Sequence, residues 1–163
     1  MCLSVYLGTS IAVELPSPAD GQLGIELASW KPPPLHRHEF VYYLGRKGQK
    51  RELECSCLFT EHVEWTANGP VVSSDALYPE DGSCPFEQLR ALCRAATVNG
   101  GWATIVADDS GGVEQRCTVD DYCSGMLPLD LIRRGNLLFA EASGSIPWKV
   151  WHVVASAGAI GAR

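Results

Sequence analysis

Two cysteines separated by a single residue, Cys55 and Cys57, are the part of this sequence best suited to chemistry. The surrounding segment 52–59 alternates apolar and polar side chains, which predicts a β-strand. Residues two apart on a strand share a face and lie about 6.5–7 Å apart along the chain. Two thiolates so placed can bind one soft metal ion such as zinc, with metal–sulfur distances of about 2.3 Å. A disulfide between them would close a small, strained ring and is less favoured.

A zinc site needs more ligands than this pair supplies. Cys2 lies in the predicted first strand, and His36 and His38 stand just before the predicted hairpin. We therefore expect a zinc site at Cys2, Cys55 and Cys57, with His36 or His38 completing the shell. The chain contains no Cys-x-x-Cys pair, so the spacing is not that of a standard zinc finger. Plain core packing of the thiols stays open, because cysteine is among the most buried residue types.

Cys2 and Cys84 are also candidates for a catalytic nucleophile. If Met1 is removed, the α-amine of Cys2 can serve as its general base, as in N-terminal nucleophile hydrolases. Cys84 precedes a predicted helix, whose aligned N–H groups lower a thiol pKa. An enzyme with a cysteine nucleophile is therefore the second hypothesis. The third is a protein-interaction module in which all cysteines are structural and exposed aromatic residues or the segment 32–34 meet a protein partner.

Three short segments carry a resemblance to known proteins. The start Met-Cys-Leu-Ser-Val-Tyr-Leu-Gly, the stretch Val41-Tyr-Tyr-Leu-Gly45 and the stretch Cys55-Ser-Cys57-Leu-Phe59 resemble a group of small uncharacterised bacterial proteins. That group begins with Met-Cys and has a Tyr-Tyr-x-Gly stretch before Cys-x-Cys-x-Phe. The resemblance implies no activity, but it implies that Cys2, Cys55 and Cys57 form one spatial unit. Glu54 and Leu58 depart from it, because the group has glycines there.

Composition narrows the function classes. The net charge of −6 and the lack of a basic cluster beyond the 46–51 turn argue against a nucleic-acid partner. No apolar run approaches the ~18 residues of a membrane span, and the start of the sequence lacks the features of a signal peptide. We therefore expect a cytoplasmic protein with no membrane partner, in which the seven cysteines are reduced. A protein partner or a homo-oligomer stays open.

The periodic segments predict an α+β fold. A helix over about 85–98 carries an apolar stripe and ends at Asn99-Gly100. Strands are predicted over 2–7, 23–30, 40–44, 52–59, 102–107, 113–119, 137–141 and 146–154, with a loop over 68–83 and a short helix over 126–134. We expect a mainly antiparallel sheet of hairpins, 40–44 with 52–59 and 102–107 with 113–119, with the helix packed on one face. The length of 163 residues predicts a single domain, with 156–163 as a frayed tail.

Overall fold

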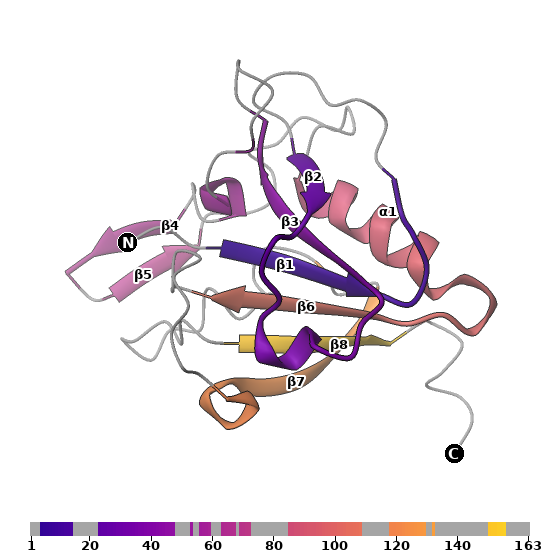
Figure 1. Cartoon of the computed structure of the whole chain (residues 1–163). Coiled ribbons are helices and arrows are strands. Elements are labelled where there is room, and N and C mark those ends of the chain that lie inside the picture. The colour runs from indigo at the N-terminus through magenta and orange to yellow at the C-terminus, as the bar shows by residue number, and fades with distance from the viewer. Residues whose placement is uncertain are drawn as a thin grey trace.

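The computed structural model describes residues 4–14, 23–47, 53, 56–59, 63–67, 69–72, 85–108, 118–129, 132 and 150–155 (Figure 1). These residues form an α+β structure around a six-stranded sheet with the strand order β2-β3-β1-β6-β8-β7. The strands are β1 (Ser4–Thr9), β2 (Leu23–Leu27), β3 (Phe40–Arg46), β6 (Ala103–Asp108), β7 (Cys123–Pro128) and β8 (Val150–Ala155). The described residues also include the helix α1 (Pro85–Thr97).

The sheet is mostly antiparallel. Every neighbouring pair runs antiparallel except β7 and β8, which run parallel. The predicted strands over 2–7, 23–30, 40–44, 102–107 and 146–154 overlap β1, β2, β3, β6 and β8. A separate two-stranded ladder joins β4 (Val63–Thr66) to β5 (Gly69–Val72), and β5 falls in the segment that was predicted to be loop.

One face of the sheet shares its hydrophobic cluster with α1. The buried helix residues of this cluster repeat every three or four positions, with Leu92 beside Cys93, and they join side chains from β1, β3 and β6: Phe86, Leu89, Leu92, Cys93 and Ala96. The predicted helix is confirmed to within one residue at its end. It stops because Asn99 (φ 56°) and Gly100 (φ 81°) adopt left-handed conformations, which these two residue types tolerate best.

The opposite face, called here the second face, is covered by the segment 28–38. This segment crosses in front of the sheet in Figure 1 and includes a 3-10 helix, Pro33–Leu35 (η1). Leu35 is completely buried in a cluster with β1, β3 and β6 side chains. Gly8 in β1 permits this close approach, because a Cβ there would lie 2.7 Å from Leu35 Cδ2 and 2.8 Å from His38 Cγ. The proline-rich connector therefore packs onto the sheet.

The predicted hairpin of 40–44 with 52–59 is wrong in its second arm. Both edges of β3 are already paired, one with β1 and one with β2. Within the described part of this segment, what remains of the hairpin is a single antiparallel bridge between Lys47 and Leu53. Beyond it, Ser56–Phe59 form a 3-10 helix (η2) and not a strand. The alternation of apolar and polar residues predicted that Cys55 and Cys57 share one face of a strand. This prediction fails for Cys57, which lies in the 3-10 helix.

Two other local predictions are also wrong. The strand β6 pairs with β1 and β8, so it has no free edge for a hairpin partner from 113–119. The short helix predicted over 126–134 is replaced at its start by β7, because parallel pairing with β8 extends residues 123–128. The predicted strand 137–141 and the predicted tail 156–163 lie outside the described residues.

Candidate functional site

A buried serine fixes the middle of the Cys-x-Cys motif. Ser56 is completely buried, and its Oγ accepts a hydrogen bond from the Val5 backbone N–H at 2.8 Å. The same hydroxyl donates to the Leu44 carbonyl oxygen. Val5 and Leu44 are register partners in the β1–β3 ladder. The hydroxyl therefore bridges the two strands near the start of β1, an arrangement called here the Ser56 bridge.

The structure describes few of the cysteines. Cys57 lies in η2, next to Ser56, whereas Cys2, Cys55 and Cys84 lie outside the described residues. Cys93 is completely buried in the α1 cluster, as the helical stripe predicted, and burial raises the pKa of its thiol. That thiol is therefore a packing group and not a reactive thiolate. Among the described residues, no three His, Cys, Asp or Glu side chains gather in a way that could hold a metal ion.

The two predicted histidine ligands differ in their surroundings. His36 is exposed, and its Nε2 lies 2.9 Å from the Lys31 carbonyl oxygen. His38 is buried, with its ring centroid 4.5 Å from that of Trp102, and its Nδ1 has no hydrogen-bond partner among the residues that the structure describes. Burial and then the nearby Lys31 charge lower the pKa of His38, against an opposing hydrogen bond with the Thr9 backbone.

His38 and the Ser56 bridge contact β1 at different ends. Ser56 bonds to Val5, whereas His38 packs against Gly8, three residues further along the strand. At about 3.3 Å per residue this separates the two contact points by roughly 10 Å. The structure thus places His38 away from the Cys-x-Cys motif, on the second face.

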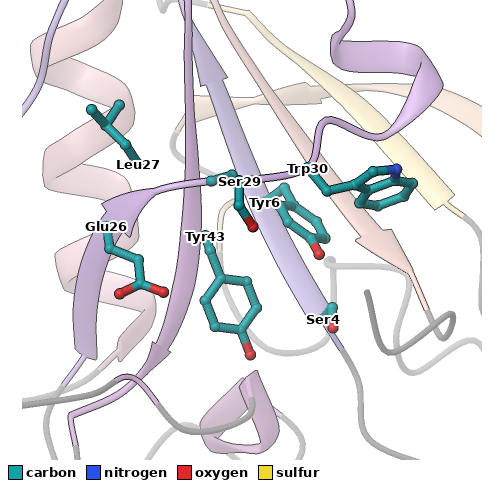
Figure 2. A pocket seen from close by; sticks show the side chains of 8 residues that line it. Ser4, Tyr6, Glu26, Leu27, Ser29, Trp30 and Tyr43 are labelled. Carbon is teal, nitrogen blue, oxygen red and sulfur yellow. The ribbon is translucent and has the colours of Figure 1, made fainter. Parts of the chain in front are cut away.

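A polar pocket lies on the second face. Its volume is about 460 Å³, and the residues that line it include Ser4, Tyr6, Glu26, Ser29, Trp30 and Tyr43 (Figure 2). We call it the aromatic pocket. Sheet register builds it, because Glu26, Tyr43 and Tyr6 are direct neighbours across β2, β3 and β1. Trp30 and Ser29 come from the segment 28–38 that covers this face.

The Tyr6 ring stands at the centre of the aromatic pocket. Its centroid lies 5.6 Å from that of Trp30 and 5.5 Å from that of Tyr43, with interplanar angles of 69° and 58°. Burial raises the pKa of Tyr6, a hydrogen bond with Ser4 opposes this, and Tyr43 and Asp108 add smaller increases, which together bring the pKa to about 12. The phenol is therefore neutral at physiological pH.

A buried carboxylate lies beside this pocket. Asp108 is completely buried at the end of β6, opposite Ser4 in the register. It accepts a hydrogen bond from the hydroxyl of Tyr122. The patterns that drew attention to the Cys-x-Cys motif gave no indication of this contact or of the pocket. The available signal was the alternation of Ser4 and Tyr6 with apolar residues along β1, which marks a second buried face.

Comparison of the chain with protein-family models, with curated proteins and with solved structures finds no match. In the part of the chain that the structure describes, no helix combines the length and the apolar character needed to cross a membrane.

Proposed function

We propose that this protein binds a soft metal ion, zinc in the first place, through Cys2, Cys55 and Cys57. The observation that carries the proposal is the Ser56 bridge. It attaches the residue between Cys55 and Cys57 to Val5, which follows Cys2 by three positions.

Chain connectivity sets how far the three cysteines can be from this bridge. Adjacent α-carbons are about 3.8 Å apart, so Cys55 and Cys57 remain next to Ser56. Three residues span at most roughly 10 Å, so Cys2 remains within that distance of Val5. Cysteine side chains reaching one ion at about 2.3 Å are compatible with these limits.

The proposal uses three protein ligands. His36 and His38 were predicted to complete the shell, but His38 packs at the far end of β1 and His36 lies two residues before it. We therefore leave the fourth position to water or to a small ligand, as in zinc sites that keep an open position. A reducing cytoplasm, expected from the sequence, would keep the thiols available for metal.

Elemental analysis of tag-free protein purified without added metal tests this proposal. We expect close to one zinc ion per chain, and loss of most of it in Cys55→Ser and in Cys57→Ser. Cys93→Ala is the matched control, because it removes a thiol that packs in the core and should keep the zinc. Ser56→Ala keeps every thiol but removes the bridge, so we expect it to lower zinc occupancy.

Metal-free wild-type protein whose melting temperature is unchanged by a chelator would contradict the proposal. In that case, intact-mass analysis after mild iodoacetamide treatment tests the second hypothesis. A single thiol that reacts fast, at Cys2 or Cys84, would favour an enzyme with a cysteine nucleophile. Uniformly slow labelling would favour structural cysteines.

A further inference from the structure

We propose that the aromatic pocket binds a small organic cation, such as a quaternary or primary ammonium group. The proposal uses only residues that the structure describes, and it does not depend on the metal site. It rests on three features of the pocket: the arrangement of its rings, the sign of its charge and its hydroxyl groups.

Three aromatic rings lie side by side in the pocket. Figure 2 shows the Tyr6 ring between those of Tyr43 and Trp30. Both neighbouring rings meet Tyr6 at steep angles of 58° and 69°, so the three do not stack as parallel plates. A cation is attracted to the face of an aromatic ring within about 6 Å of the centroid. Rings set at angles around one space can present several such faces to the same cation.

The pocket carries negative charge, which attracts a cation. Among the described residues that line it, Glu26 is the only charged one. Glu26 lies opposite Tyr43 in the β2–β3 register, beside the rings (Figure 2). A bound cation would therefore meet the Glu26 carboxylate beside the rings, in a protein whose net charge is −6.

The size and the polar groups of the pocket fit a small ligand. A volume of about 460 Å³ lies within the ~300–1,000 Å³ usual for small-molecule sites. Hydroxyl groups of Ser4 and Ser29 also line the pocket and can accept a hydrogen bond from an ammonium N–H or from a hydroxyl on the ligand. An anionic ligand is disfavoured, because the described lining offers a carboxylate and no positively charged group.

Choline and its uncharged analogue 3,3-dimethyl-1-butanol provide the decisive pair of probes. Both have the same branched shape, but only choline carries the positive charge. Isothermal titration of the wild-type protein should show choline binding at least about tenfold more tightly than the neutral analogue, from combined cation–π and carboxylate contributions. Equal binding of the two, or binding of neither, would overturn the proposal. Binding of glucose or inorganic phosphate in preference to choline would overturn it as well.

Variants locate the binding in this pocket. Glu26→Gln removes an exposed carboxylate and should weaken choline binding by about two- to fivefold. Glu39→Gln, an exposed glutamate that does not line the pocket, is the matched control and should leave the affinity unchanged. Trp30→Ala should weaken binding by about tenfold, whereas Trp30→Phe keeps a ring and should recover most of the loss. The same affinity in Glu26→Gln, Trp30→Ala and the wild type would overturn the assignment to this pocket.

Discussion

The two faces of the central sheet bury their side chains in different ways. The face that shares a cluster with α1 is lined by aliphatic and aromatic side chains, with Leu89 and Ile105 completely buried. The second face is covered by irregular chain and carries Tyr6, Asp108 and the buried His38 next to its apolar residues. Packing of α1 against the sheet accounts for the burial of side chains on the first face. The second face keeps polar groups and a pocket, so it is where we expect a ligand to bind.

The largest expected effect is on the free energy of unfolding, when a buried leucine is replaced by alanine on one face or on the other. Leu89 and Leu35 are each completely buried, Leu89 in α1 and Leu35 in η1. Leu89→Ala should lower the free energy of unfolding by about 3–5 kcal/mol, because the regular elements around it cannot collapse into the cavity. Leu35→Ala should cost about 2 kcal/mol, because irregular chain can relax more fully.

Urea denaturation of the two leucine variants measures this difference. Choline titration provides the second measurement, since Leu35→Ala should weaken binding in the aromatic pocket more than Leu89→Ala does. Equal losses of stability, together with unchanged choline affinity in both variants, would show that the two faces are equivalent.

A smaller effect is expected at the close contact between β1 and the segment 28–38. In Gly8→Ala, the new Cβ would stand 2.7 Å from Leu35 Cδ2 and 2.8 Å from His38 Cγ, which is too close without a shift. Overpacking of this kind costs about 1–3 kcal/mol. Thermal unfolding should show the loss, and the double variant Gly8→Ala/Leu35→Ala should recover part of it by opening space. A double variant whose losses simply add would mean that Leu35 is not the group displaced.

The smallest effect is the pH dependence contributed by His38. Burial lowers its pKa in the folded protein below the value of about 6.5 expected in the unfolded chain. Between these two values the unfolded chain binds more protons, so the free energy of unfolding falls as the pH drops below about 6.5. Melting curves from pH 7.5 to pH 5 should show this slope, and His38→Gln should reduce it. If the variant shows the same pH dependence as the wild type, a group other than His38 takes up the proton.

The sequence predicted the helix α1 better than the pairing of the strands. The helix over 85–98 followed from an apolar stripe and a glycine stop, and both are local signals. The second arm of the 52–59 hairpin failed because strand pairing is decided by competition for sheet edges, and β3 has none free. Alternation along a short segment cannot report which edges distant strands have taken.

The candidate site was predictable only in part. The Cys-x-Cys spacing drew attention to the correct segment, but the residue that attaches it to β1 is Ser56, which carries no sequence signal of its own. The aromatic pocket depends on a register that aligns Glu26, Tyr43 and Tyr6 across three strands. Residues so far apart in the chain meet through pairing alone, which periodicity does not specify.

X-ray absorption at the zinc edge, measured on protein as purified, tests the central claim most directly. The account predicts zinc bound by three sulfur atoms at about 2.3 Å, with the remaining position filled by a lighter atom. A zinc shell made only of nitrogen and oxygen, or protein that holds no zinc after purification and reconstitution under reducing conditions, would contradict it.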